Sequence, residues 1–454
     1  MTNKMAETPV KKLMLSMGIP IIFSMMFQAL YNIVDSAFVA HIAHNGEAAL
    51  NALTLAFPVQ MLMVAIGIGT GVGVNALMAK FLGMGDKKRA SHVAGNAIFL
   101  GFIIYIVFLV FGLFGTEFYI RSQTKDPQII AMGVSYLKIC CIASFGIVFY
   151  SLYEKIIQST GRSLYTTIAQ VGGALCNIIL DPILIFGYFG LPALGVNGAA
   201  LATVLGQIIS FLLDFYFHFR YDKEIDNNPR YIKPDMHMIR SIYSIGFPAI
   251  IAQALMSFMT YGLNIIFGMI DGRIVTAYGL YYKIQQFILF AAFGLRDAIT
   301  PIVSFSFGMS NKQRIKEGMK YGCLYTTIIM VIGLVLLEIF APQLTSVFGL
   351  SGPTATLCIS AIRIISISFL FAGINIAMQG CFQALNEGMM TLVIALLRQL
   401  VLVIPVAYIF ALCVKTMNAP QSLLWVTFII SEGVSFIVTM IFKKKVEKTR
   451  IENI

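Results

Sequence analysis

Long apolar stretches, separated by short polar loops, follow one another along the whole chain. A helix that crosses the roughly 30 Å hydrocarbon layer of a bilayer needs about 20 mainly apolar residues. Stretches of this length recur here from end to end. They predict an all-α membrane protein with twelve transmembrane helices, at residues 13–42, 50–79, 93–115, 129–153, 164–187, 194–218, 241–270, 275–307, 321–341, 354–384, 389–413 and 421–442.

Composition excludes two other classes of protein. Of the 454 residues, 58% are hydrophobic and only 12% are charged, whereas a soluble domain carries about 25% charged residues. A soluble fold could not hide this much apolar surface, and a disordered chain needs the opposite composition. The net charge of +11 does not indicate nucleic acid, because the basic residues lie between the apolar stretches. We therefore expect the lipid bilayer as a partner and no nucleic-acid partner.

The distribution of Lys and Arg predicts how the chain crosses the membrane. Basic residues gather in both tails and in the second, fourth, sixth and eighth loops, whereas the tenth loop has none. The opposite loops hold only Arg121, Lys125, Arg273 and Lys415. Loops rich in Lys and Arg stay in the cytoplasm, so both termini are expected there.

A repeat divides the sequence into two halves. GMGDKKR at 83–89 recurs as GMSNKQR at 308–314, and the segment that begins at Ile19 is matched by one that begins at Phe247. Each half would hold six helices running in the same direction, which predicts two pseudo-symmetric six-helix lobes related by an axis along the membrane normal. The charged loop at 220–235 is the expected divide, giving an amino-terminal lobe at 1–225 and a carboxyl-terminal lobe at 226–454.

Two acidic residues lie deep within predicted helices. An ionised Asp in hydrocarbon costs roughly 2.5–3.5 kcal/mol, so such a residue is a functional candidate. Asp35 and Asp181 share a depth, about two turns from the outer ends of the first and fifth helices; Asn177 is on the same face as Asp181, and Thr203 reaches a similar level. Oxygen ligands suit hard cations, and paired carboxylates hold a cation or share a proton. These four residues predict a coupling-ion site, although each acid could instead bond a neighbouring helix or Lys138.

The second half has no acid at the equivalent positions. Leu263 and Val406 stand there. If the acids served only packing between the halves, both halves would carry them. The asymmetry favours a single ion site in the first half.

The other charges within the predicted helices are less specific. Arg398 and Glu432 lie near mid-depth, where a buried ion pair and a substrate role are both open. Acids and bases near helix ends can extend their charged groups to water and are expected to be structural or interfacial; these are Glu154, Asp214, Arg296, Asp297 and Glu338. His41, His44 and Glu47 have a metal-like spacing, but their place in an outer loop favours a solvated segment.

No motif for catalysis is present. The chain lacks GxxxxGK[ST], HExxH and GxSxG, so it has no recognisable apparatus for ATP hydrolysis or proteolysis. The seven cysteines have no CxxC or metal spacing and are expected to be buried free thiols. We predict that the protein is not an enzyme and draws its energy from an ion gradient.

These features together resemble one family of transporters. The first helix carries PxxxxxxxQxxYNxxDxxFV, and the rest of the evidence is the paired GMxxKxR loops and QSTGR before NxxxDP. This is similar to the multidrug and toxic compound extrusion (MATE) family, over essentially the whole chain and most of all to its bacterial branch with an acidic site in the amino-terminal lobe. In that family two lobes enclose a cleft that opens to each side in turn, and organic cations leave in exchange for Na⁺ or H⁺.

The resemblance implies roles for particular residues. Its first-lobe site corresponds to Asp35, Asn177, Asp181 and Thr203, which bind Na⁺ as a metal site or H⁺, with no other cofactor. The residues expected to bind substrate are Gln28, Tyr31, Asn32 and Arg398. Some members carry acids in the seventh and tenth helices; here the nearby positions are Gln253, Met256, Gly373 and Asn375. A sodium site in the carboxyl-terminal lobe is therefore not expected.

The sequence leads to one principal functional hypothesis and one alternative. The first is a secondary active antiporter of the bacterial inner membrane, acting as a monomer, that exports amphipathic organic cations in exchange for Na⁺ or H⁺ by alternating access. The alternative is a flippase for a lipid-linked saccharide or another anionic lipid precursor. It would use Arg363 and Arg398 to hold phosphate, and the acids argue against it.

Overall fold

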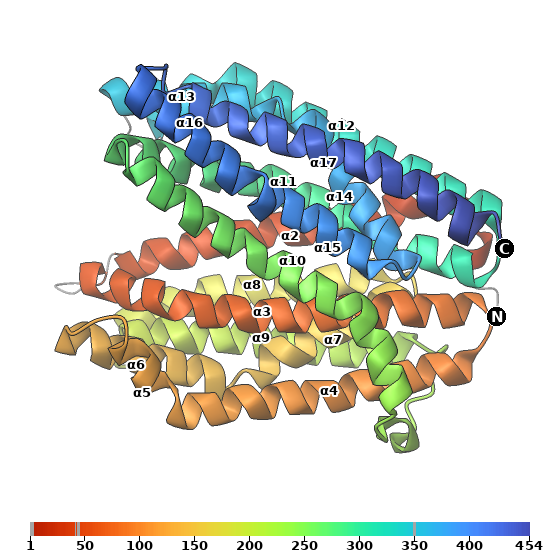
Figure 1. The fold of residues 1–454 in the computed structure, drawn as a ribbon. Helices are drawn as coiled ribbons and strands as arrows, with labels where there is room; N and C mark the ends of the chain where they lie inside the picture. Colours follow the sequence, from red (N-terminus) through yellow and green to blue (C-terminus); the bar gives the residue numbers. More distant parts are fainter. Residues whose placement is uncertain (1–3, 41, 43–45, 348–350) are drawn as a thin grey trace. The chain divides into compact units, whose positions relative to one another are not determined.

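The structure, a computed structural model, describes residues 4–40, 42, 46–347 and 351–454, and every regular element in these ranges is helical (Figure 1). The shorter helices cap or connect the long ones. The elements are α1 (Lys4–Glu7), α2 (Val10–Ala40), α3 (Gly46–Gly83), α4 (Lys87–Phe114), α5 (Thr116–Arg121), α6 (Pro127–Ile142), α7 (Phe145–Ser159), α8 (Ser163–Phe186), η1 (Tyr188–Gly190), α9 (Val196–Tyr221), η2 (Pro229–Ile232), α10 (Met236–Gly268), α11 (Gly272–Gly308), α12 (Lys312–Val347), α13 (Gly352–Ser366), α14 (Phe369–Ala384), α15 (Gly388–Leu396), η3 (Leu397–Val401), α16 (Val403–Met417), α17 (Leu423–Val446) and η4 (Glu447–Ile451).

The helices confirm the predicted membrane fold. Within the described ranges, ten helices are long and apolar enough to cross a bilayer, and two bent pairs bring the number to twelve if each pair is one span. The pair α6 and α7 bends by 44°, and the pair α13 and α14 bends by 54°. These pairs are the fourth and tenth predicted spans, one in each half of the repeat. Both breaks come directly before a Ser-Phe sequence, at Ser144 and Ser368.

The two copies of the repeated loop also fold alike. The third residue of each copy, Gly85 or Ser310, has a positive φ of 74° or 53°. The following residue, Asp86 or Asn311, caps the next helix by accepting the backbone N–H three residues on, at 2.9 Å and 3.0 Å. A left-handed conformation is uncommon for a residue with a side chain. Its presence at Ser310 shows that the loop conformation, as well as the sequence, repeats.

Contacts divide the chain into two compact units: residues 23–250, and residues 1–22 together with 251–454. Each division falls inside a long helix, α2 or α10. The loop at 220–235, predicted as the divide between the lobes, packs within the 23–250 unit. Tyr231 is buried there, with its ring edge-on to His92. The division into lobes at 1–225 and 226–454, which follows the sequence repeat, stays a prediction.

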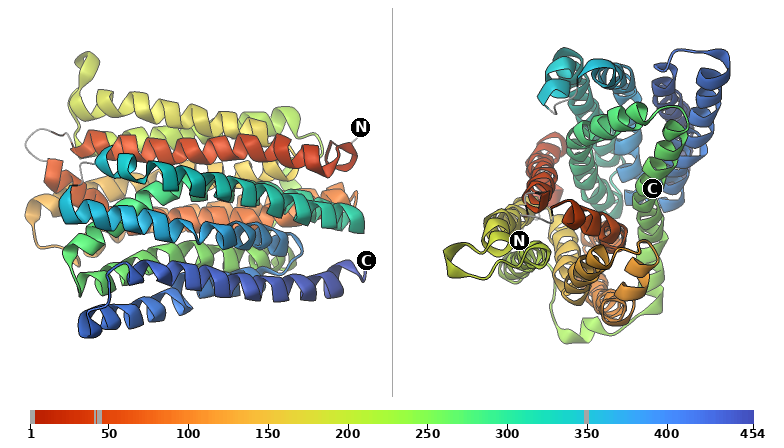
Figure 2. Two further views of the ribbon diagram at one scale, coloured as in Figure 1. Left: turned by 90° about the horizontal axis from the view of Figure 1, so that it is seen from above. Right: turned by 90° about the vertical axis from the view of Figure 1, so that its left-hand side faces the viewer.

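Close packing of α8 and α9 shapes the 23–250 unit, whose helices run lengthwise along one another (Figures 1 and 2). Glycines bring the two backbones together. A Cβ atom added at Gly206 would lie 2.7 Å from the carbonyl oxygen of Gly173 and 3.1 Å from Cβ of Asn177. This approach determines which residues of α9 lie beside the polar face of α8.

We expect Gly206→Ala to destabilise the protein by about 1–3 kcal/mol, the usual cost of overpacking. The added methyl group meets backbone, which cannot move aside as a side chain can. Gly172→Ala is the matched control, because its methyl group would meet only the end of the Leu213 side chain, at 3.0 Å. Thermal unfolding of the purified variants would measure the difference. Equal unfolding temperatures would show that this close approach does not limit stability.

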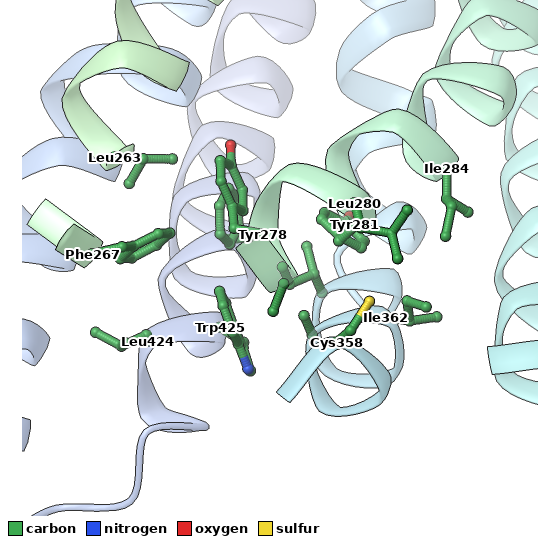
Figure 3. Packing of buried hydrophobic residues seen from close by; sticks show 14 of the residues in the cluster. Leu263, Phe267, Tyr278, Leu280, Tyr281, Ile284, Cys358, Ile362, Leu424 and Trp425 are labelled. Atoms are coloured by element: carbon green, nitrogen blue, oxygen red, sulfur yellow. The ribbon is translucent and has the colours of Figure 1, made fainter. Parts of the chain in front are cut away.

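The unit of 1–22 and 251–454 contains a large apolar cluster (Figure 3). Leu263 and Phe267 of α10 pack there with Tyr278 of α11 and Trp425 of α17. The Phe267 ring is edge-on to both Tyr278 and Trp425, at 5.3 Å and 5.5 Å between centroids. Leu263, the predicted counterpart of Asp35, is thus a fully buried core residue.

Candidate cation site

The carboxyl-terminal ends of α2 and α8 lie side by side in the 23–250 unit. Val39 and Ile185 belong to one buried apolar cluster, and the rings of Phe38 and Phe186 meet edge to face at 6.4 Å. Asp35 is four residues before Val39, and Asp181 is four residues before Ile185. Residues four apart share a helix face. Both acids therefore lie one turn below the shared cluster, at the common depth that the sequence predicted.

The two carboxylates form a pair in which Asp35 is partly buried. Asp181 is fully buried, and the charges of Asp35 and Asp181 interact. Asn177 Nδ2 is 3.5 Å from Asp181 Oδ1. At this pair, three buried acceptors lack a hydrogen-bond donor within the described part of the chain: Asp35 Oδ1, Asn177 Oδ1 and Asp181 Oδ2. Such acceptors are costly to bury unless a cation or a proton satisfies them, so their chemistry fits either ion.

Thr203 lies at the same level on α9. Five residues before it, Gly198 packs on Leu184; three residues after it, Gly206 packs on Gly173 and Asn177. Because α8 and α9 run antiparallel, the stretch of α8 opposite Thr203 lies between these contacts and includes Asp181. The register thus brings the hydroxyl-bearing residue to the height of the acid pair, as predicted.

Aromatic and amide groups complete the surroundings, and two of them, Tyr136 and Gln60, were not predicted from the sequence. The phenols of Tyr31 and Tyr136 each interact electrostatically with both acids. Gln60 Nε2 donates to the Tyr136 hydroxyl at 3.2 Å. Tyrosine and glutamine are ordinary residues in a long helix, and nothing in their spacing identified Tyr136 or Gln60.

The residues predicted to bind substrate lie in different surroundings. Gln28 accepts a hydrogen bond from Gln170 Nε2 at 3.0 Å, and Ser24 donates to Gln170 in turn. Tyr31, one turn after Gln28, joins this polar face to the acids. The side chain of Asn32 lies outside the described residues.

Arg398 is part of a buried ion pair in the other unit. Its guanidinium lies 2.6 Å from Glu432 Oε1, and Asn375 Nδ2 donates to Glu432 Oε2 at 2.8 Å. Thr439 donates to Asn375 Oδ1 at 2.9 Å and completes the chain of contacts. The helix forms a π-turn at Leu397–Val401, which contains Arg398. The ion pair, one of the two roles left open, is therefore formed.

Some charges near the predicted helix ends do not reach water. Asp214 is fully buried, Asp297 is 5% exposed and Glu154 is 8% exposed. Arg296 compensates Asp297 at 2.9 Å. Of the two roles expected for these acids, structural and interfacial, the interfacial one was wrong for these three, because neighbouring helices cover them.

Two alternatives for ion binding find no support in the described residues. Lys138 is exposed, and no ion pair joins it to Asp35 or Asp181 in the part of the chain described. The same ranges contain no group of three His, Cys, Asp or Glu side chains placed to hold a metal. His41 and His44, and the side chain of Glu47, lie outside the described residues.

The fold and this site define a multi-pass helical membrane protein with a polar site enclosed in one helical unit. The family model MatE matches residues 20–183 and 248–409, so the chain belongs to the MatE family. Multidrug export protein MepA of Staphylococcus aureus is 23% identical over 403 residues, covering 89% of this chain and 88% of that protein.

Solved transporters of the same family share the fold. An outward-facing multidrug resistance MATE family transporter of the MOP superfamily has a TM-score of 0.90 and 25% identity, covering 98% of this chain and 97% of that one. A MATE structure in the straight conformation has the same TM-score and identity, with 97% of each chain covered. The protein is accordingly a multi-pass protein of the plasma membrane, and its relatives are transporters rather than enzymes.

Proposed function

We propose that the protein is a secondary active antiporter that exports amphipathic organic cations in exchange for Na⁺ or H⁺. The names of its relatives, multidrug export protein and multidrug resistance transporter, support export of varied organic compounds. The observation that carries the ion coupling is the pair of Asp35 and Asp181, each of which has one buried oxygen without a donor in the described ranges, beside a third such oxygen on Asn177.

The acid pair would act as the ion switch. Two close carboxylates repel one another, and a bound Na⁺ or H⁺ relieves that repulsion. The helices that carry the pair can respond, because Pro182 lies inside α8 directly after Asp181. A proline removes one backbone donor and frees the carbonyl oxygen four residues earlier, at Ile178. Ion arrival would therefore change the packing of α2 against α8, next to Gln28 and Tyr31, and weaken the hold on the exported cation.

The topology, the oligomeric state and the coupling ion also belong to the proposed function. We propose that both termini lie in the cytoplasm, as the positive loops predict, and that the protein works as a monomer in a bacterial inner membrane by alternating access. Na⁺ or H⁺ is the coupling ion, and no other cofactor is required. The flippase alternative loses its main residue, because the charge of Arg398 is already neutralised by Glu432.

Transport by purified protein in liposomes tests this function. Ethidium movement would be followed with a Na⁺ gradient alone, with a pH gradient alone, and with neither. We expect at least one gradient to drive ethidium against its own concentration. No accumulation with either gradient, by protein that is folded and inserted, would contradict the antiporter. Translocation of a phosphorylated lipid in the same vesicles would instead indicate the flippase.

A further inference from the structure

A second buried acid site lies elsewhere in the 23–250 unit, on α7 and α9. Asp214 of α9 is fully buried, and neither of its carboxylate oxygens has a hydrogen-bond partner in the described part of the chain. Its charge interacts with Glu154, Lys155 and Asp222. Asp214 is eleven residues from Thr203 along α9, which corresponds to about 16 Å at 1.5 Å per residue. It is thus separate from the Asp35–Asp181 site.

The positive charge that interacts with Asp214 in this cluster, that of Lys155, already contacts other side chains. Lys155 Nζ lies 3.6 Å from Glu154 Oε1 and donates to Gln158 Oε1 at 3.0 Å. Gln158 Nε2 donates to Glu154 Oε1 at 2.8 Å. One ammonium group therefore faces two buried carboxylates, and its closest carboxylate contact among these is with Glu154. An excess buried carboxylate takes up a proton or a cation rather than remain ionised.

Asp222, the next acid along the chain, shows the contrast. Its oxygens accept hydrogen bonds from Thr160 Oγ1 at 2.7 Å and from Arg162 Nη1 at 3.2 Å, and His218 Nδ1 lies 3.0 Å away. These donors satisfy the oxygens of Asp222 and connect it to Arg162, whose side chain is 26% exposed. Asp214 is the acid in this cluster that lacks such donors.

A phenol of α7 also belongs to this cluster. Tyr150 interacts electrostatically with both Asp214 and Glu154. The Tyr165 ring of α8 packs instead on Phe217 and Tyr221 of α9.

We propose that Asp214 is a second proton-binding site of the 23–250 unit, which holds a proton because both of its oxygens are buried without a donor among the described residues. The inference goes beyond the proposed antiporter and does not depend on which ion drives transport.

Infrared difference spectra test the proton site without any transport measurement. Purified protein at neutral pH should show absorption from a protonated carboxylic acid, and Asp214→Asn should remove about one such group per molecule. Glu154→Gln provides a second test should Asp214→Asn fold poorly: with its competitor gone, Asp214 pairs with Lys155 and ionises, and the same absorption disappears. An unchanged spectrum in either folded variant overturns the site.

Discussion

Replacing either Asp35 or Asp181 with asparagine is expected to reduce gradient-driven ethidium transport to the level of empty liposomes. Asparagine keeps the size and polarity of the side chain but cannot be ionised or take up an exchangeable proton. The pair would then hold at most one negative charge, and arrival of the coupling ion could no longer relieve a repulsion. Binding of ethidium itself, measured by fluorescence, should persist.

The result needs a control for the chemical change itself. Asp126→Asn is suitable, because Asp126 caps α6 by accepting the N–H groups of Gln128 and Ile129, and asparagine caps helices equally well. This variant should transport ethidium normally. Normal transport by Asp35→Asn or Asp181→Asn protein, at equal abundance, would reject the pair as the coupling site.

The largest expected effect on stability concerns the pair of Arg398 and Glu432. Arg398→Met should destabilise the protein by about 3–5 kcal/mol, because removing one partner leaves a buried charge uncompensated. The side chains of Arg398 and Glu432 are only 8% and 14% exposed. Adding Glu432→Gln should restore most of the stability, since the amide is neutral and can still accept a hydrogen bond from Asn375. Thermal unfolding of the single and double variants would measure this.

The same double variant separates the two roles considered for Arg398. If the ion pair is purely structural, the stable double variant should bind and transport ethidium like the unaltered protein. Weakened ethidium binding in a stable double variant would assign Arg398 or Glu432 to the substrate. A single variant as stable as the unaltered protein would show that the pair does not compensate a buried charge.

The acid pair could be predicted because its signal is local. An ionisable residue deep in an apolar stretch is conspicuous, and counting residues from the helix end places Asp35 and Asp181 at one depth. The helices α2 and α8 end five residues after these acids, at Ala40 and Phe186. Tyr136, Gln60 and Tyr150 carry no comparable signal. Their roles depend on which helix face meets which neighbour, and that is a matter of packing.

Asp214 shows where counting along the chain fails. Its distance from the predicted helix end placed it near water, yet α9 extends to Tyr221 and neighbouring helices cover the carboxylate completely. The burial of a polar group depends on what packs against it as well as on its depth in the membrane.

The sequence by itself determined the number of membrane spans, the internal repeat and the restriction of the paired acids to one half. The lengths of the apolar stretches, the repeated loops and the charged residues inside apolar stretches can all be recognised from the order of residues alone. Tertiary structure alone decided that α6 and α7 meet at a 44° bend, that Arg398 pairs with Glu432 and that Asp214 is buried without a hydrogen-bond donor in the described part of the chain. These outcomes arise from contacts between distant helices, where close packing and the cost of burying charge act on neighbours that the linear order does not reveal.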